Sequence, residues 1–262
     1  MQRYRLLAPL CFLILLYFSP PHSFPQFCLD LWHKYSNIRD PNDWASGSWF
    51  SKSSLIASQF KWVGKTVAKS MMHLPSGLSK EATRLHKCIL GYCGDKTIQY
   101  PEMLAQNILK KGVDQSELVD EIYILILKQM TDNPKKESER RLWQLVCLAV
   151  GTFPPSDDFE SYLLNFVLKK RELPGEVGGY AKYCLRRLEG IVKTGASGFV
   201  PSVEEIMAYS ERPPILATIE LVDGAVLAEN LPVTPDLSVE KVCDVSVVEK
   251  EESTSTRKRS LD

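Results

Sequence analysis

Residues 117–134 read ELVDEIYILILKQMTDNP, and this stretch decides the fold. Up to about Met130 its apolar residues occupy nearly every side of a helix, which is typical of a helix surrounded by other elements. The β-branched residues would also suit a strand, but the length of the run favours a helix. Residues 114–117 (DQSE) resemble a capping box at its start, and Asn133-Pro134 ends it. The sequence therefore predicts a central, buried helix.

Shorter amphipathic segments lie on both sides of this helix. The expected helices run from Ser79 to Gly91 or Gly94, from Tyr100 to Gly112, from Ser138 to Phe153-Pro154, from Ser156 to about Val167, from Tyr180 to about Val192 and from Ser202 to about Tyr209. Glycine, proline and capping residues set these limits, with Gly178-Gly179 read as a loop. We therefore expect an all-α, multi-helix bundle in which Trp143 is buried against the central helix.

Two further segments differ from the bundle in their pattern. After residues 212–214 (RPP) the apolar period changes from 3.6 to 2, and Asp223-Gly224 is a hairpin turn signal, so residues 215–233 predict a β hairpin. A short helix is expected at 238–243, before a charged tail. At the other end, residues 6–18 are almost entirely apolar after a basic leader. They are too few to span a bilayer, which takes about 20 residues.

The apolar N-terminal segment leaves two interpretations open. A basic leader followed by a short apolar run and a helix breaker is typical of a secretory signal peptide, although no small-x-small cleavage site follows. The segment is then either a membrane-targeting element or a non-native start joined to an internal tail fragment. Residues 21–79 carry four scattered tryptophans, so we expect short helices and loops that pack partly on the bundle.

The order of these motifs resembles the myosin tail homology 4 domain, a helical module of unconventional myosin and kinesin tails. The matching stretches are residues 92–95 (YCGD), 117–123 (ELVDEIY), 128–134 (KQMTDNP), Trp143, 151–156 (GTFPPS), 183–188 (YCLRRL) and 200–206 (VPSVEEI). Residues 219–224 (IELVDG) resemble the opening hairpin of the ubiquitin-like first lobe of a FERM domain. The family's Arg-Gly-Trp stands here as Arg141-Leu142-Trp143.

The resemblance and the residue patterns together define five expected segments. Residues 1–20 form the apolar N-terminal segment, 21–79 an irregular and partly ordered region, 80–212 the myosin tail homology 4 domain, 213–245 a partial FERM first lobe, and 246–262 a disordered tail. The FERM lobe would be incomplete, because no further strands are predicted after the hairpin.

Composition and motifs argue against catalysis and against nucleic-acid binding. The 32 basic and 32 acidic residues give zero formal net charge, so no global basicity attracts nucleic acid. The seven cysteines form no Cys-x-x-Cys pair, which favours buried thiols over a zinc site. The four histidines are read as preceding the main bundle, and no hydrolase, metalloprotease or phosphate-loop motif occurs. We expect a protein that is not an enzyme and has no cofactor.

Basic residues gather at three expected helix ends, where they predict a binding surface. They are Lys110, Lys111, Lys135, Lys136, Arg140, Arg141, Lys169, Lys170 and Arg171. The resemblance implies tubulin in microtubules, or a cargo protein, as the partner, with an adjoining FERM domain in a full-length parent and a cytoplasmic, cytoskeletal location. A signalling scaffold and a fragment without independent function are the alternatives. Membrane or secretory localisation applies only if residues 1–20 are functional.

Overall fold

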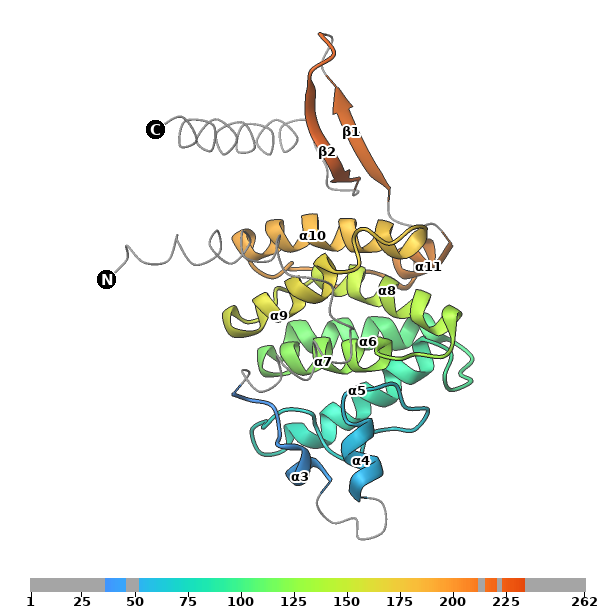
Figure 1. Cartoon of the computed structure of the whole chain (residues 1–262), viewed down its shortest axis with the longest axis vertical. Helices are drawn as coiled ribbons and strands as arrows, with labels where there is room; N and C mark the ends of the chain where they lie inside the picture. Colours follow the sequence, from blue (N-terminus) through green and yellow to red (C-terminus); the bar gives the residue numbers. More distant parts are fainter. Residues whose placement is uncertain (1–35, 46–51, 212–214, 221–222, 234–262) are drawn as a thin grey trace, which may run out of the picture. The chain divides into compact units, whose positions relative to one another are not determined.

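The computed structural model describes residues 36–45, 52–211, 215–220 and 223–233. The helices are α3 (Pro41–Trp44), α4 (Lys52–Ser58), α5 (Leu78–Tyr92), α6 (Pro101–Asp114), α7 (Val119–Met130), α8 (Lys136–Val150), α9 (Asp157–Leu168), α10 (Glu176–Thr194) and α11 (Val203–Glu211), with a 3-10 turn η1 (Ser116–Leu118) before α7. Strands β1 (Leu216–Glu220) and β2 (Val226–Pro232) form an antiparallel hairpin. The predicted helical bundle with a short hairpin is confirmed (Figure 1).

The apolar N-terminal segment, the expected helix at 238–243 and the charged tail all lie outside the described residues. Within the described ranges, no helix combines the length and the apolar character that crossing a membrane requires.

Helix α7 is the core of the bundle. All twelve of its residues are buried, and α5, α6 and α8 pack against it. Figure 1 shows α7 between α5 and α8. Trp143 of α8 is fully buried as predicted, and its indole lies 5.8 Å, centroid to centroid, from the ring of Phe166 in α9. The central helix inferred from the apolar run is thus confirmed.

The polar side chains of α7 are also buried, and they bind the segment that precedes α5. Glu121 accepts hydrogen bonds from the backbone N–H groups of Met71 and Met72, at 2.7 and 2.8 Å. Burial raises the pKa of Glu121 to about 7, against the opposing effect of these two bonds. The side-chain amide of Gln129 accepts from the N–H of Val63 at 3.3 Å and donates to its carbonyl at 2.9 Å. Residues 58–72 are therefore hydrogen-bonded to the central helix.

His86 lies inside the bundle, which corrects the reading that all histidines precede it. It is fully buried in α5, where Nδ1 accepts the N–H of Val67 at 3.2 Å and Nε2 lies 3.3 Å from Oε1 of Gln129. Burial, and then the charge of Lys128, lowers the pKa of His86 to about 3. Nε2–H therefore donates to Gln129, and the imidazole is neutral. Lys128 donates in turn to the carbonyl of Ser58 at 2.9 Å.

Three predicted helix starts differ in the structure. The expected capping box at 114–117 is not formed: Asp114 ends α6, and neither η1 nor α7 has a side-chain cap. Helix α5 begins after Gly77, whose φ of 94° favours glycine, while Ser79 lies within hydrogen-bond distance of Ser70. Helix α8 begins at Lys136, two residues before Ser138. At Ser79 and Ser138 the expected capping hydroxyl instead bonds other segments, Ser70 and Asp95 respectively, whereas Asp114 is simply the last residue of α6.

The other caps are confirmed. The hydroxyl of Ser156 accepts the N–H of Phe159 at 3.2 Å and opens α9. Ser202 and Glu205 form a reciprocal capping box at the start of α11, with bonds of 3.2 and 2.7 Å.

Two predicted glycine breaks lie inside helices. Gly112 belongs to the last turn of α6, where an added Cβ would stand 2.3 Å from the ring of Phe153. Gly178 and Gly179 belong to the first turn of α10, and a Cβ at Gly178 would meet the carbonyl oxygen of Leu173 at 2.0 Å. At Gly112 and Gly178 the missing side chain allows close packing and does not end a helix.

The hairpin packs on the bundle through its second strand. Strand β2 contacts α10, and Leu231 is buried. The register pairs Leu216 with Pro232 and Glu220 with Val226, with irregularities between these pairs. The hairpin predicted from the change of period is confirmed.

Candidate functional site

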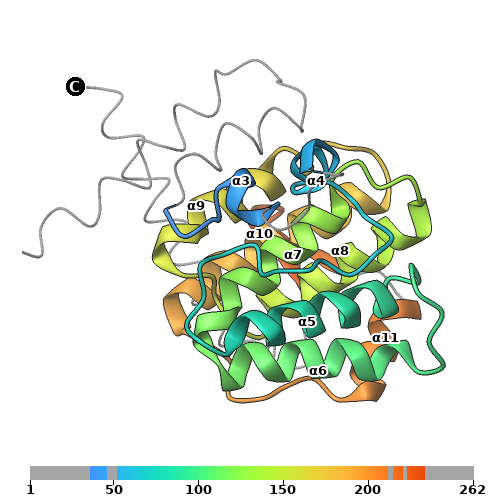
Figure 2. The same ribbon diagram turned by 90° about the horizontal axis from the view of Figure 1, so that it is seen from below.

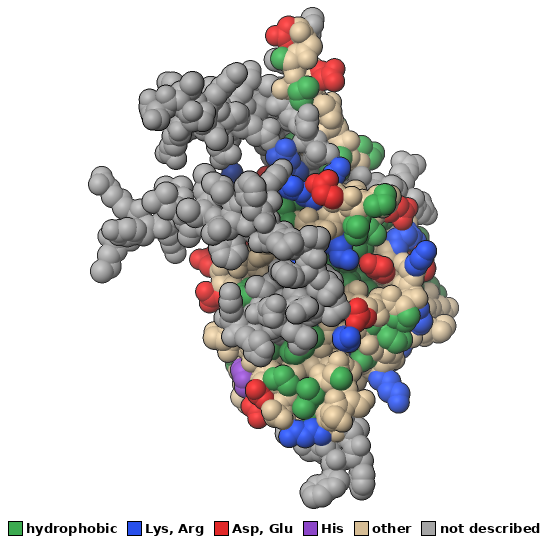
Figure 3. Space-filling view, viewed as in Figure 1, with side chains coloured by type: hydrophobic (Ala, Val, Ile, Leu, Met, Phe, Trp, Pro, Cys, Tyr) green, Lys and Arg blue, Asp and Glu red, His purple; other side chains and the backbone are tan. Residues whose placement is uncertain are grey.

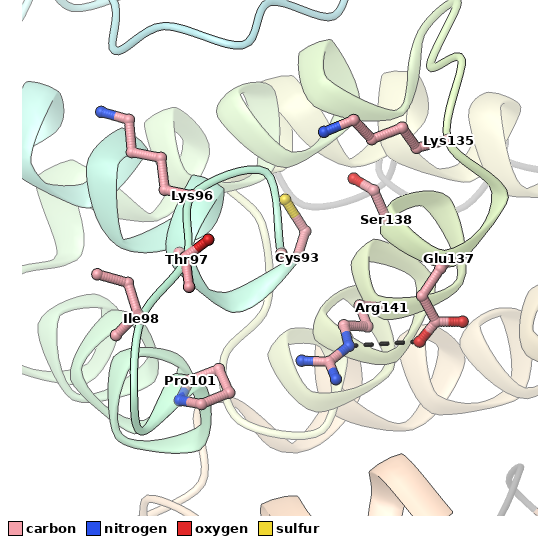
Figure 4. A pocket seen from close by; sticks show the side chains of 11 residues that line it. Cys93, Lys96, Thr97, Ile98, Pro101, Lys135, Glu137, Ser138 and Arg141 are labelled. Carbon is pink, nitrogen blue, oxygen red and sulfur yellow. Dashed lines mark hydrogen bonds and ion pairs between the residues drawn. The ribbon is translucent and has the colours of Figure 1, made fainter.

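A pocket of about 350 Å³ opens where the loop after α5 faces the start of α8. Figure 4 shows Thr97, Ile98 and Pro101 on one wall and Glu137, Ser138 and Arg141 on the other, with Cys93 between them. Helices α5 and α6 lie side by side in Figure 2, so the pocket is at the end of this pair where α5 stops and α6 starts. The remaining lining residues are Gly91, Gly94, Lys96 and Lys135.

Two glycines shape the first wall. Gly94 has a φ of 81°, which favours glycine, and the N–H of Lys96 then donates back to the carbonyl of Leu90 at 2.9 Å. At Gly91 an added Cβ would stand 2.4 Å from Cδ1 of Leu104 and 3.1 Å from Cγ1 of Ile98. The missing side chains let the loop fold closely over the end of α5.

Two helix N-termini meet at this pocket without a side-chain cap. Helix α6 begins at Pro101 after Tyr100, and α8 begins after Lys135; neither N-cap residue makes a side-chain hydrogen bond to its helix. The first amides of a helix carry a partial positive charge and lack partners within the helix. Both ends therefore favour a negatively charged group in the space between them.

Arg141 contributes a guanidinium with unused donors. Its Nε lies 3.4 Å from Glu137, and Nη1 donates to the carbonyl of Tyr92 at 3.2 Å. Among the described residues its Nη2 has no hydrogen-bond partner. Glu137 is engaged more closely by Arg140, with bonds of 2.9 and 2.7 Å, and these bonds lower the pKa of Glu137. One carboxylate thus serves two guanidiniums, and Arg141 is the less satisfied.

Asp95 holds Lys135, a second cation of the pocket, in place. Its side chain is fully buried and accepts hydrogen bonds from Trp62 at 2.8 Å and Gln129 at 3.2 Å, while Nζ of Lys135 lies 3.0 Å away. Burial raises the pKa of Asp95, but these bonds outweigh it and the net pKa is lowered. Lys135 also lies 5.7 Å from the centroid of the Trp62 ring. Asp95 is therefore an ionised acceptor that positions Lys135.

The pocket region carries an excess of positive charge. Lys96 is bound to a neutral group, the hydroxyl of Thr66, at 2.7 Å. Among the residues that line the pocket, Lys96, Lys135 and Arg141 are three cations against the one carboxylate of Glu137, and Asp95 pairs with Lys135 beside them. The excess is local, since acidic and basic side chains are mixed over the face of the described residues in Figure 3.

The structure brings together only part of the predicted basic surface. Lys135 and Arg141 line the pocket, and Lys136 and Arg140 are their neighbours at the start of α8. Residues 110–111 lie near the other end of α6, where Lys111 pairs with Glu81 at 3.2 Å. Residues 169–171 follow the end of α9. The nine residues are thus distributed over three separate helix ends.

Several residues of the site were not identified from the sequence. Lys96 is an isolated lysine, and Asp95 follows a glycine at a helix stop, so neither stands out in a charge count. Glu137 is one of many acidic residues in first helical turns. The sequence does show that one helix ends at 91–94 and the next begins at Pro101. This spacing predicts a tight loop between the two helices, but it does not show which residues lie opposite the loop.

The described residues contain no group of three or more His, Cys, Asp or Glu side chains arranged to hold a metal ion. The four described cysteines are free thiols. Cys147 and Cys184 are both buried, with their sulfurs 3.5 Å apart between α8 and α10. Burial raises the pKa of Cys93, the pocket thiol, to about 11, which keeps it protonated.

Comparison with known proteins agrees with this architecture. Residues 105–208 match the family model of the MyTH4 domain. The chain is 33% identical over 181 residues to the high molecular weight form of myosin-1 of Acanthamoeba castellanii, and the aligned stretch covers 69% of the chain. It is 42% identical over 117 residues to Myosin-VIIa of Drosophila melanogaster, which covers 45% of it. The chain spans only 11% and 5% of these two relatives.

Solved structures share the fold. The human Myosin 7b C-terminal MyTH4-FERM domain, solved in complex with the harmonin-a PDZ3 domain, superposes with a TM-score of 0.60 at 24% identity over 88% of the chain and 44% of that structure. The MyTH4-FERM MF1 domain of Dictyostelium discoideum Myosin VII gives a TM-score of 0.59 at 22% identity over 82% of the chain and 43% of its own length. The chain therefore contains a MyTH4 domain, followed by a hairpin that fits the start of a FERM domain.

Proposed function

We propose that this chain is a non-catalytic adaptor module of a myosin-type tail and that it binds an acidic segment of a partner protein at the start of α8. Microtubules are the proposed partner, because tubulin presents flexible acidic tails. The module would then act in the cytoplasm, at the cytoskeleton. A cargo protein is the second candidate, and the harmonin-a PDZ3 domain in the human Myosin 7b structure favours it.

One observation carries the proposal: two uncapped helix N-termini and an excess of cations face one pocket. Helix N-termini and guanidinium forks both bind carboxylates, and a pocket holds the carboxylate where both act on it. Lys136 is exposed next to the pocket and can attract an acidic chain at longer range. The clusters at 110–111 and 169–171 do not line this pocket, so we assign binding to the α8 cluster.

The test is co-sedimentation of the full chain with microtubules at several salt concentrations. We expect weak binding that falls as salt rises, because exposed charges are screened beyond about 8 Å at physiological ionic strength. A Lys136→Gln, Arg141→Gln double variant should bind several-fold less. Glutamine removes the positive charge, keeps a polar side chain and avoids placing a new carboxylate beside Asp95 or Glu137.

A matched double variant, Lys110→Gln with Lys111→Gln, removes the same charge at the other end of α6. It should bind like the parent. Equal loss in both variants would mean that net charge alone matters and that the pocket is not the site. If the parent fails to sediment even at low salt, the microtubule partner is wrong, and a search for acidic cargo follows.

A further inference from the structure

Three exposed apolar side chains lie within six residues of each other at the basic pocket. They are Ile98, which lines the pocket, Tyr100 and Met103, and we call them the apolar shelf. Their exposed fractions are 45%, 59% and 57%. Of the ten large hydrophobic side chains that are exposed in the described residues, three fall within residues 98–103. Isolated exposed hydrophobic residues are ordinary, whereas a cluster beside a charged pocket marks an interaction site.

The shelf is held rigidly in place. Tyr100 is the N-cap residue of α6 and Met103 lies in its first turn, while Ile98 lies over Gly91 and lines the pocket. A preorganised surface loses less conformational entropy when a ligand binds to it. The shelf and Arg141 are thus two parts of one fixed surface, one apolar and one cationic.

We propose that this surface recognises an acidic segment that also carries apolar side chains, with its carboxylate on Arg141 and its apolar residues on the shelf. This inference rests on the proposed function and narrows its partner class. The charge pattern favours one orientation: Glu102 in the first turn of α6 disfavours a carboxylate on the side of the shelf, whereas the unused donors of Arg141 attract one on the opposite wall. A purely acidic chain would use only half of the surface.

The experiment measures fluorescence anisotropy of two labelled peptides with the full chain. One peptide combines glutamates with leucines, and the other has the same charge with serines in place of the leucines. We expect the leucine peptide to bind about tenfold more tightly, the factor that burial of roughly 50 Å² of apolar surface gives. Added salt should weaken the binding of both peptides. The ratio of their dissociation constants should stay the same, because salt screens charges and does not weaken apolar contact.

Two variants assign that ratio to the shelf. Met103→Gln should reduce it to near one, and the matched change Leu173→Gln, at an exposed leucine in the loop after α9, should leave it unchanged. If both peptides bind the parent equally and Arg141→Gln weakens both, the shelf does not contribute to binding and this inference is wrong, while the proposed acidic-segment site stands. No binding of either peptide, together with no microtubule binding, would overturn both. A dimer that dissociates on Met103→Gln in analytical ultracentrifugation would show that a second copy covers the shelf, which also overturns this inference.

Discussion

The same substitution, glycine to alanine, should have opposite effects at two helical positions. Gly112 lies in the last turn of α6, and an added Cβ would stand 2.3, 2.5 and 2.9 Å from three atoms of the Phe153 ring. Gly190 lies in α10, is exposed, and an added Cβ would have no heavy atom within 4 Å. Because the chemical change is identical, the difference between the two variants reports the contact with Phe153 alone.

The magnitude follows from the geometry. Phe153 is 1% exposed, and its carbonyl accepts the hydroxyl of Tyr123, so the ring has little room to retreat. Ordinary contact begins at 3.4 Å, so the ring or α6 must move by about 1 Å. Overpacking of this kind costs about 3 kcal/mol at the upper end, and alanine returns about 1 kcal/mol of helix propensity. Gly112→Ala should therefore lose about 2 kcal/mol of unfolding free energy, and Gly190→Ala should gain up to about 1 kcal/mol.

Urea denaturation followed by circular dichroism measures both changes, provided that the dependence on denaturant is the same in each variant. Gly112→Ala combined with Phe153→Leu should recover part of the loss, because the smaller side chain gives the Cβ room. If Gly112→Ala is as stable as Gly190→Ala, the close approach of α6 to Phe153 is wrong, and with it the reason for a glycine inside this helix.

Two further predictions concern the core. The pKa of His86 is lowered from 6.5 to about 3, because burial disfavours its charged form. Its contribution to stability is therefore complete above pH 6.5 and is lost as the pH falls toward 3. At most about 5 kcal/mol of unfolding free energy is involved. Denaturation curves across this range should show a smaller loss in His86→Gln than in the parent, and equal losses would contradict the neutral, buried histidine. Trp143→Ala should destabilise the fold by about 3–5 kcal/mol, because it empties a fully buried site beside Phe166. A thermal melt within one or two degrees of the parent would show that this indole is not part of the core.

The sequence predicted the bundle well where a pattern has only one physical explanation. The apolar run of α7 is too long for an ordinary buried strand and so fits a surrounded helix, and Ser202 with Glu205 caps α11 as its spacing requires. The prediction failed where one residue type serves two purposes. Gly112 was predicted to end a helix, whereas in the structure it allows α6 to pack closely on Phe153. A glycine in the sequence is compatible with either role, so the sequence alone could not distinguish them.

The candidate pocket could be predicted only in part, for a different reason. The sequence identified Lys135 and Arg141 by their charge, but it could not show that the loop at 94–98 stands opposite them. That placement depends on contacts between distant segments, such as the bond from Trp62 to Asp95. Contacts of this kind leave no local periodicity, so charge counting could not separate the α8 cluster from the clusters at 110–111 and 169–171.

The position of Lys135 depends on residues that are distant from it in the sequence. Trp62 and Asp95 lie outside residues 105–208, the part of the chain that matches the MyTH4 family model, yet both contact Lys135 within it. Asp95 also accepts from Ser138 at 3.3 Å, which fixes the first turn of α8. The position of the pocket cation is therefore set by residues that lie 40 to 73 positions before it in the sequence. A prediction made from the basic residues of α8 alone could not place Lys135, because its ion pair and its ring contact come from these distant segments.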